Sequence, residues 1–477
     1  MNYPLVFAAC AALGIGACGS ITGNRNVASR LADLPPDLRG IWQTEGYGYV
    51  IDLGAEAITV YDATPDICVR NPGVGADVLD ILGSGQVVFN ARKTAFDITL
   101  PYEPHPIRAN RQAALPTPCQ TPLPDTPEAS FEAFASFFKT HYAFFDLYGV
   151  DWDSTVEAAR ARLRPDMSDA ELFALMADML RPLRDGHIEL SGKVAGRQRL
   201  YEPNKGTTLV ALKALAEAKG IAPETLKTRF QKAYWRDGIA GEILNGKGTR
   251  TGSGFVQYGM TSGDIGYLAL VTVAGYANGD IGDPAADKAA LDRIMDAALT
   301  EFAENRAKAV IIDLSVNFGG QDFIARAIAE RFAAQPVTAY AKRAGDRAGG
   351  YGGARAFALR LTPHTGMRYR GPVYVMTSDV TVSGGEILTM ALRALPQVVH
   401  VGMPTRGALS DVLEKTLPNG WEIALSNEIY TDHAGILWEG RGITPEIQIP
   451  VFDPQNPLTG HVAAVERLTR MIDKAHD

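Results

Sequence analysis

The stretch Ser383-Gly384-Gly385-Glu386 has the residue types and the position that acyl-transfer chemistry requires. An apolar run at 373–376 precedes it and predicts a buried strand, and a helical pattern of apolar residues begins at Ile387. A Ser between a strand and a helix places its hydroxyl on a sharp turn, beside the Gly384 amide and the positive end of the helix dipole. The stretch therefore predicts a nucleophile with half of an oxyanion hole. A helix N-cap, in a capping box with Glu386, is the alternative.

A second Gly-rich turn, Asn317-Phe318-Gly319-Gly320, follows the apolar run at 309–314. Loops that follow the carboxyl ends of strands in an open α/β sheet meet in one crevice. We therefore expect the amide of Gly319 or Gly320 and the amide of Gly384 to converge on one oxygen atom. A tight strand-to-helix turn is the alternative. A phosphate-binding loop is not expected, because the Lys-Ser/Thr pair of such loops is absent.

A Ser nucleophile needs a base that is neutral near physiological pH, and His has an ordinary pKa of about 6.5. The chain contains eight His. His187 stands at a junction where Gly186 ends a helical pattern and a short apolar strand begins, a placement that none of the others shares. His187 is therefore the candidate base, with a surface or core His as the alternative.

Changes in the spacing of apolar residues divide the 477-residue chain into regions. Strands alternating with helices predict an α/β domain over 261–455, with helices on both faces of its sheet. The other regions are expected to be a small all-β accessory domain (35–100), a Pro-rich linker (101–129), a helical bundle that carries His187 (130–192), a connecting region (193–260) and a C-terminal helix (456–477).

The beginning of the chain has the pattern of an export signal. Residues 5–15 are apolar but short for a membrane span, and they lead into Gly16-Ala17-Cys18. This pattern resembles a bacterial lipoprotein signal, so we expect a signal peptide over 1–17, a lipidated Cys18 and a polar tether over 18–34. The protein is then expected in the bacterial cell envelope, anchored to the membrane and facing the periplasm or the exterior. An ordinary secretory peptide with a chance Cys is the alternative.

Cleavage before Cys18 leaves Cys68 and Cys119 in an exported chain. Disulfides persist outside the cytoplasm, so we expect a structural bridge between these two residues. Their spacing does not suit a metal site, and no metal or cofactor is expected. A net charge of −8 offers no basic field for nucleic acid, and 46% hydrophobic with 21% charged residues is ordinary for a globular protein.

Five motifs follow one another in order, at residues 183–187, 313–320, 383–388, 401–407 and 440–447. Together they resemble the serine peptidase family of tail-specific (carboxyl-terminal processing) proteases and tricorn protease, over roughly 130–451. The resemblance implies a ClpP/crotonase-like α/β fold, a peptide or protein substrate and hydrolysis of peptide bonds through an acyl-enzyme. It implies no cofactor, and it predicts no oligomeric state.

The resemblance also implies how the Ser is activated. Tail-specific proteases use a Lys base in a Thr-Phe-Gly-Lys-like motif, and the matching residue here is Ala408, which cannot accept a proton. The tricorn-like branch uses a His from the helical region and an acidic residue that precedes a Gly-containing motif, and here these are His187 and Glu439. The resemblance thus implies Ser383 as nucleophile, His187 as base and then acid, and Glu439 as the group that orients and charges the site.

One relay position departs from the tricorn pattern. Gly186 stands where tricorn has a Ser that links the His to the acid, so another side chain such as Asp185, a water molecule or direct contact must replace that link. A Ser–Lys protease with a displaced Lys415 is a second enzymatic interpretation. A non-catalytic ligand- or peptide-binding protein, like the retinoid-binding relatives of this fold, is the alternative from another class.

Overall fold

The computed structural model describes residues 34–280, 283–345 and 355–476. The expected signal peptide, the lipidation site Cys18 and the expected tether up to residue 33 lie outside the described residues. Within the described ranges, no helix is both long and apolar enough to cross a membrane.

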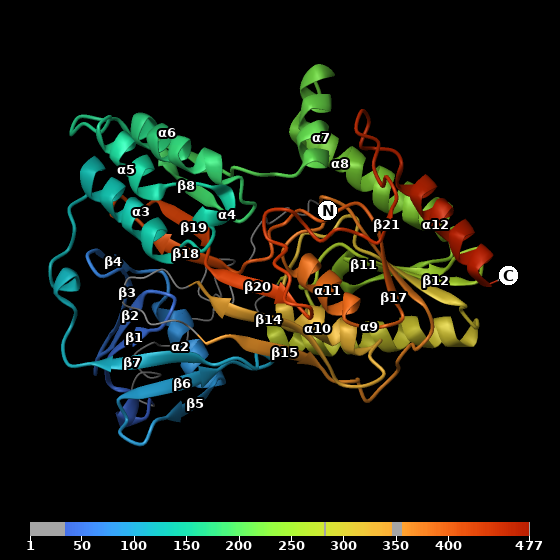
Figure 1. The fold of residues 1–477 in the computed structure, drawn as a ribbon, viewed down its shortest axis with the longest axis horizontal. Helices are drawn as coiled ribbons and strands as arrows, with labels where there is room; N and C mark the ends of the chain where they lie inside the picture. The colour runs from blue at the N-terminus through green and yellow to red at the C-terminus, as the bar shows by residue number, and fades with distance from the viewer. Residues whose placement is uncertain (1–33, 281–282, 346–354, 477) are drawn as a thin grey trace.

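The N-terminal domain is a seven-stranded antiparallel sheet in the order β4-β3-β2-β1-β7-β6-β5, at the lower left of Figure 1. Its elements are β1 (Gly40–Thr44), β2 (Tyr49–Leu53), β3 (Ile58–Ala63), β4 (Cys68–Asn71), α2 (Gly75–Ser84), β5 (Gln86–Phe89), β6 (Ala95–Thr99) and β7 (Ile107–Gln112). Two features differ from the expectation. Helix α2 interrupts the β pattern, and β7 lies inside the predicted linker 101–129, where it pairs with β1 and β6. Pro residues stand on both sides of β7, at 101–106 and at 116–127, so the Pro-rich composition does not mark a linker throughout.

Cys68 and Cys119 form a disulfide in this domain, as expected from the sequence, across a separation of 51 residues. Cys68 begins β4, and Cys119 lies in a short 3₁₀-helix (Thr117–Gln120). The bridge therefore fastens the segment that leads into the helical bundle to the edge of the sheet.

The helical bundle packs on a four-stranded sheet whose strands come from distant parts of the chain. Its helices are α3 (Pro127–His141), α4 (Phe145–Tyr148), α5 (Trp152–Arg160) and α6 (Asp169–Leu180). The sheet order is β18-β19-β8-β9, with β8 (Glu189–Val194), β9 (Arg197–Tyr201), β18 (Val412–Thr416) and β19 (Glu422–Ser426). Since β8 pairs with β19, the stretch just before β8, which contains His187, lies beside the C-terminal part of the chain.

The α/β domain contains a second seven-stranded sheet in the order β10-β11-β12-β13-β16-β17-β21. The strands are β10 (Thr249–Thr251), β11 (Val256–Met260), β12 (Ile265–Leu270), β13 (Ala309–Asp313), β16 (Val373–Thr377), β17 (Val398–Gly402) and β21 (Ile447–Gln448). The last five are parallel. Such strands are buried on both faces, which explains their continuous apolar runs.

Successive residues of β12 and β13 enter two separate cores. Leu268 and Val310 pack with α9 (Pro284–Glu304), α10 (Asp322–Glu330) and α11 (Gly384–Arg393). Tyr267 and Ile311 pack with α8 (Pro223–Gln231), the π-helix η4 (Lys232–Ile243) and α12 (His461–His476). Figure 1 shows these two helical layers on opposite sides of the sheet. The α/β fold class predicted from the sequence is confirmed.

Further elements fall in regions where the sequence pattern was weak. A three-stranded sheet, β15-β14-β20, is formed by β14 (Val337–Ala344), β15 (Phe357–Leu361) and β20 (Glu428–Asp432). The connecting region contains α7 (Thr207–Ala218) in addition to α8 and η4. Helix α7 projects from the body of the molecule in Figure 1.

Buried charges join the N-terminal domain to the rest of the chain. Lys415 Nζ of β18 lies 3.1 Å from Asp62 Oδ1 of β3, and both side chains are fully buried. Lys342 Nζ lies 3.0 Å from Glu428 Oε2, and Tyr47 donates a hydrogen bond to the same carboxylate. Because buried charges are costly unless paired, these contacts fix the two parts in one arrangement.

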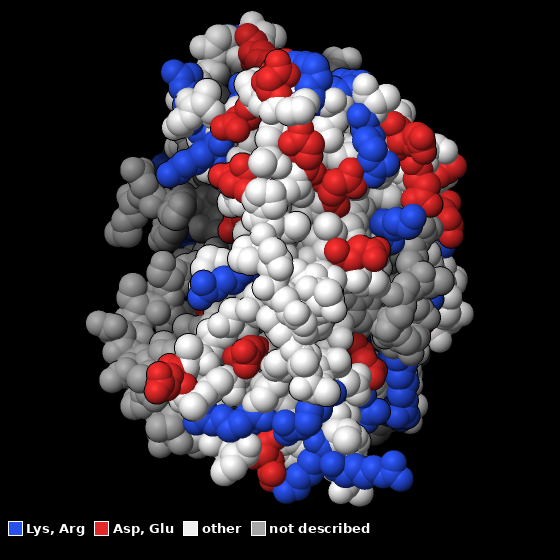
Figure 2. Space-filling model, turned by 90° about the vertical axis from the view of Figure 1, so that its left-hand side faces the viewer, with Lys and Arg blue, Asp and Glu red and all other residues white. Residues whose placement is uncertain are grey.

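The face that carries the N-terminal domain and the bundle shows both signs of charge. In Figure 2, Lys and Arg side chains are interspersed with Asp and Glu over the upper part of this face, Lys and Arg predominate along its lower edge, and a broad uncharged band lies between these areas.

Candidate active site

Ser383 occupies a strained turn between β16 and α11. Its backbone has φ 56° and ψ −127°, a positive φ that is uncommon for a residue with a side chain. The preceding loop is fastened to the end of β13, because Ser378 Oγ donates to the Ser315 carbonyl (2.6 Å) and Thr381 Oγ1 donates to the Leu314 carbonyl (2.7 Å). Strain of this kind persists only where the surroundings impose it, and it is common at functional sites.

The two Gly turns lie against one another, as the sheet topology predicts. A Cβ atom placed on Gly319 would lie 2.6 Å from Ser383 Cβ, and one placed on Gly384 would lie 2.9 Å from the Gly320 amide nitrogen. Neither position therefore accepts a side chain without movement of the turn. The close approach brings two backbone N–H groups beside Ser383.

The amides of Gly320 and Gly384 are the pair that remains available. The Gly319 N–H donates to Asn317 Oδ1 at 2.9 Å, so it is already used. At Gly320, the bridge to Val273, in the segment after β12, uses the flanking groups, because Val273 donates to the Gly319 carbonyl and Gln321 donates to the Val273 carbonyl. Of the two alternatives that the sequence left open, the geometry favours Gly320.

Glu386 connects the nucleophile turn to the segment at 405–410. Its carboxylate accepts hydrogen bonds from the amides of Gly407 and Ala408, both at 2.8 Å, and from the amide of Ser383 at 3.3 Å. The Ser383 amide also donates to the Ala408 carbonyl at 2.9 Å. The capping contact from Glu386 to the Ser383 amide is therefore present, and it belongs to a larger network that holds the turn in place.

His187 follows the short 3₁₀-helix that ends the bundle, and Asp185 positions its backbone. The His187 amide donates to Asp185 Oδ1 at 2.8 Å, and this carboxylate also accepts from Tyr142 Oη (2.9 Å) and Ser426 Oγ (3.0 Å). Asp185 is fully buried. It therefore ties the His187 junction to the helical bundle and to β19.

The imidazole of His187 is buried, and neither ring nitrogen has a hydrogen-bond partner among the described residues. Burial lowers the pKa of His187 to about 4; the Asp411 charge and the Ser410 backbone act in the opposite direction, and the Arg406 charge adds to the decrease. The ring is thus neutral at physiological pH, which is the state that a proton acceptor requires.

Gly186 explains the departure from the tricorn relay. A Cβ atom at Gly186 would lie 2.9 Å from Ala408 Cβ and 3.2 Å from Arg406 Cδ. A Ser at this position would displace the 406–408 segment that holds Ser383. The small residue thus permits close packing, and it leaves no room for a side-chain relay there.

Glu439 binds the same segment from another side. Its Oε2 accepts hydrogen bonds from the amides of Leu409 and Ser410, both at 2.9 Å, while Oε1 is buried without a partner among the described residues. Burial, with the charges of Asp185 and Glu386, raises the pKa of Glu439 well above its ordinary range. Of these two buried carboxyl groups, Asp185 accepts three hydrogen bonds, whereas Glu439 Oε1 accepts none. We therefore assign Glu439 as the protonated group and Asp185 as the ionised one.

The structure therefore gathers Ser383, His187 and Glu439 around the segment at 406–410. Ser383 bonds the Ala408 carbonyl, the His187 ring lies beside the Ser410 backbone, and Glu439 bonds the Leu409 and Ser410 amides. Among the residues that the structure describes, no hydrogen bond joins the three side chains directly. Catalytic hydrogen bonds are often long or unformed before substrate binds, so this geometry is compatible with a triad.

Lys415 is not available as a displaced base. It is fully buried, its Nζ is paired with Asp62, and it lies 3.5 Å from the centre of the Tyr49 ring. Ala408, which occupies the position of the family Lys, is also fully buried. In the described part of the chain, no group of three or more His, Cys, Asp and Glu side chains is arranged to hold a metal ion.

Several residues around the site were not singled out from the sequence. Tyr142 and Ser426 lie outside the motifs, and they meet at Asp185 only in the folded chain, where β19 pairs with β8. Asp411 follows the motif at 401–407 closely, but nothing in that motif indicates that its charge acts on His187. Glu386 was expected only as a helix cap, and its bonds to Gly407 and Ala408 join two loops that sequence spacing does not relate.

Comparisons with known proteins bear on the fold and the family. Residues 264–449 match the sequence profile of peptidase family S41, and residues 124–181, which span the bundle, match the tricorn protease C1 domain. A candidate peptidase from Parabacteroides merdae ATCC 43184 aligns with a TM-score of 0.57 at 22% identity, over 73% of this chain and 96% of that chain. Mature CPAF aligns with a TM-score of 0.50 at 14% identity, over 73% and 97%. No curated protein matches the chain.

At these identities the solved structures establish the fold alone, while the two profiles identify the family. The profile matches fall on the α/β domain that carries Ser383 and on the bundle that precedes His187. The resemblance predicted from the five motifs is thus confirmed, because the α/β domain matches peptidase family S41 and the bundle matches the tricorn protease C1 domain.

Proposed function

We propose that this protein is a serine peptidase that cleaves peptide bonds through an acyl-enzyme on Ser383, with His187 as general base. The observation that carries the proposal is the conformation of Ser383, which is held at positive φ in a turn that packs against the Gly319-Gly320 turn. A nucleophile on a strained turn with two convergent N–H donors is the arrangement that acyl transfer requires.

Each step assigns one task to a residue of this chain. Ser383 Oγ attacks the carbonyl carbon of the scissile bond while His187 accepts the hydroxyl proton. The amides of Gly320 and Gly384 donate hydrogen bonds to the negative oxygen of the tetrahedral intermediate. When the carbon–nitrogen bond breaks, His187 returns the proton to the leaving amine. Water then attacks the acyl-enzyme, and His187 again accepts and returns a proton, which releases the second product and restores Ser383.

Asp185 and Glu439 support this chemistry through the backbone. Asp185 fixes the amide of His187, and Glu439 fixes the amides of Leu409 and Ser410 beside the imidazole. Both therefore act as positioning residues. In this assignment Glu439 holds the backbone beside His187 in place, and the burial of His187 keeps its imidazole neutral.

A fluorophosphonate probe tests the proposal, because it reacts with an activated Ser and needs no knowledge of the natural substrate. The wild type should be labelled at Ser383, and Ser383→Ala should not be labelled. His187→Ala should react at least about a thousandfold more slowly, since removal of the base disables the nucleophile. The exposed Ser154 provides the control, and Ser154→Ala should react like the wild type. Equal labelling of the wild type and Ser383→Ala would support the ligand-binding alternative instead.

We also propose that the mature protein is exported and anchored to the membrane through a lipid on Cys18. The support is the apolar stretch followed by Gly16-Ala17-Cys18, together with a disulfide of the kind that persists outside the cytoplasm. Cys18→Ser should release the protein from the membrane fraction or leave a precursor of higher mass. Cys10→Ser, which alters a Cys within the apolar stretch, is the control and should leave both unchanged. Unchanged fractionation of Cys18→Ser would contradict the anchor.

A further inference from the structure

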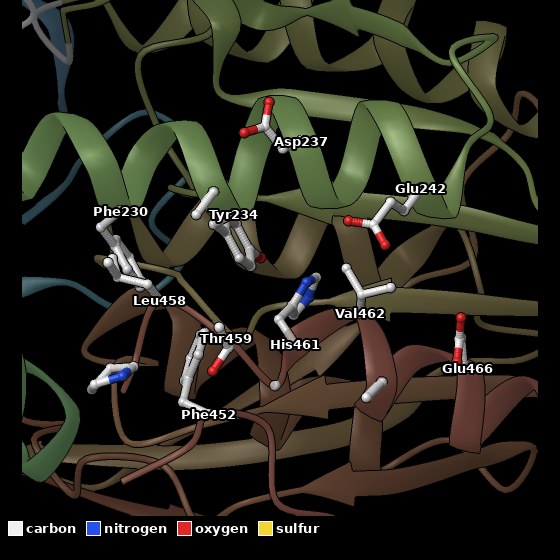
Figure 3. Close-up of a pocket in the computed structure, with 14 residues that line it drawn as sticks. Phe230, Tyr234, Asp237, Glu242, Phe452, Leu458, Thr459, His461, Val462 and Glu466 are labelled. Carbon is white, nitrogen blue, oxygen red and sulfur yellow. The ribbon is translucent and has the colours of Figure 1, made fainter. Parts of the chain in front are cut away.

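A cavity of about 460 Å³ lies between the π-helix η4 and the segment that leads into α12. It is separate from the candidate active site, since Ser383, His187 and Glu439 do not line it. Its volume lies within the range of small-molecule sites, which is roughly 300–1,000 Å³. Figure 3 shows side chains from η4 and from 452–466 facing each other across this space.

Aromatic rings form one wall of the cavity. Phe230 and Tyr234 stack with ring centres 6.1 Å apart, and Phe452 lies 5.8 Å from Phe230. Leu458 and Val462 extend the apolar surface (Figure 3). Such a wall accommodates a hydrocarbon body, and ring faces attract a cation placed over them.

Three carboxylates line the cavity, and the basic side chain of its lining, His461, is paired with the buried Asp313. Asp237 and Glu242 come from η4, and Glu466 comes from α12; no Lys or Arg lines the cavity. Asp237 also pairs with Arg236 at 3.1 Å and with Lys232 at 3.6 Å, and Glu466 lies 3.7 Å from Arg470; the side chains of these pairs are exposed. Glu242 projects toward the cavity in Figure 3. The local field therefore favours a cationic ligand over an anionic one.

His461 lies at the inner end of the cavity and is the first residue of α12. Its Nε2 lies 2.6 Å from Asp313 Oδ2, and its buried Nδ1 has no partner among the described residues. Although burial acts in the opposite direction, the charge and hydrogen bond of His461 lower the pKa of Asp313. Nε2 therefore donates to the Asp313 carboxylate, and the buried Nδ1 is the ring atom left without a partner at this end of the cavity.

We propose that this cavity is a binding site for an alkylammonium group, with the hydrocarbon part against Phe230, Tyr234 and Phe452 and the ammonium near Glu242 and Glu466. Both a free primary amine and a lysine side chain of a polypeptide offer this chemistry. The site is independent of the peptidase chemistry proposed above, because its occupant contacts none of the residues assigned to that reaction.

Calorimetric titration of the folded protein with n-pentylamine tests the proposal, with 1-pentanol and hexanoate as neutral and anionic probes of similar length. Pentylamine should bind with a dissociation constant on the order of 1 mM, and at least about threefold more tightly than either comparison compound. N-acetyl-lysine-N-methylamide forms a second arm. If it binds more tightly than pentylamine, the natural source is a polypeptide; the reverse order indicates a free amine. Equal or weaker binding of pentylamine than of pentanol would overturn the proposal.

Two variants locate the binding. The double variant Glu242→Gln, Glu466→Gln should weaken pentylamine binding about three- to tenfold, since two partly exposed charges are lost. The matched control changes two exposed glutamates elsewhere, Glu157→Gln and Glu304→Gln, and should bind like the wild type. Ala463→Phe should also weaken binding, because it places a ring in the cavity from an exposed position of its lining. Unchanged affinity in the double variant and in Ala463→Phe would place the amine elsewhere and refute the site. Fluorophosphonate labelling of Ser383 reports separately on the peptidase proposal.

Discussion

The pH dependence of Ser383 reactivity should reveal a base with an unusually low pKa. Burial lowers the pKa of His187 to about 4, so the imidazole remains neutral well below the pH at which an exposed His becomes charged. With an ordinary pKa of about 6.5, the neutral fraction, and hence the labelling rate, would rise about tenfold between pH 5.5 and pH 8. With a pKa of about 4, the rate should vary by less than about 10% over that range.

Substitution of Arg406 tests the physical cause. The methylene groups of Arg406 lie against Gly186, and the charge of Arg406 lowers the pKa of His187, so Arg406→Gln should raise that pKa, by about half a unit to one unit. At pH 4.5 about three quarters of the wild-type imidazole is neutral, and an increase of one unit reduces this to about one quarter. Labelling of Arg406→Gln at pH 4.5, relative to its own plateau at pH 8, should therefore fall up to about threefold further than that of the wild type.

The assay is the second-order rate constant of fluorophosphonate labelling between pH 4.5 and pH 8, with circular dichroism at each pH. The spectroscopic control is necessary because buried neutral His residues reduce stability in acid. The folded pKa of His187 lies below the unfolded value, so its contribution is complete above about pH 6.5 and is lost as the pH falls toward 4, by about 3 kcal/mol in total. Arg470→Gln, on the surface of α12, is the matched control.

Two outcomes would refute this reasoning. A transition near pH 6.5 in the wild type would show that the imidazole is solvated when it acts. An acid limb that Arg406→Gln leaves unchanged, in protein that circular dichroism shows to be folded, would mean that His187 is not the group that titrates. A base other than His187 would then have to be sought.

Three further predictions concern Gly186, the Lys415–Asp62 pair and the Cys68–Cys119 disulfide. Gly186→Ser should slow labelling about ten- to hundredfold, because its Cβ would displace the segment that holds Ser383, whereas Gly83→Ser, with no atom near its Cβ, should not. Lys415→Met should lower the free energy of unfolding by about 3–5 kcal/mol in urea titrations, because Asp62 is left buried and unpaired, and should not shift the pH profile; a shifted profile would revive the Lys base. Cys119→Ser should lower the unfolding free energy by about 2–4 kcal/mol, and reductant should destabilise the wild type but not the variant.

The sequence predicted best the elements that combine a strong apolar period with turn residues. Three elements lie where expected: the strand before Ser383, the helix after it and the turn at Asn317–Gly320. A buried parallel strand is marked by a continuous apolar run and a tight turn by its Gly residues, so both can be recognised from the local sequence. The boundaries of β7 and the strands β14 and β15 were missed. Their short alternating patterns stand among Pro, Gly and charged residues, and pairing with other strands decides their conformation: β7 pairs with β1, and β14 pairs with β15 and β20.

The relation between His187 and the acidic residues is the part that sequence could not supply. The motifs pointed to Asp185, His187 and Glu439, but they did not show which backbone amides each carboxyl group binds. That follows from the pairing of β8 with β19, which places Ser426 beside Asp185 and leaves Glu439 to bind the amides of Leu409 and Ser410.

Asp185 and Glu439 therefore differ in protonation state, although both are buried in the same part of the molecule. Two like charges cannot both remain ionised in so little solvent, and the group with more donors keeps its charge more easily. Asp185, with three donors, is the better anion, and Glu439, with an unpartnered oxygen, is the better acid. A neutral Glu439 still accepts both amides through Oε2, so it can hold the 409–410 backbone beside His187 without raising the pKa of the imidazole. The low pKa of His187 and the high pKa of Glu439 then have one common cause, which is the exclusion of water from the space between the bundle and the α/β domain.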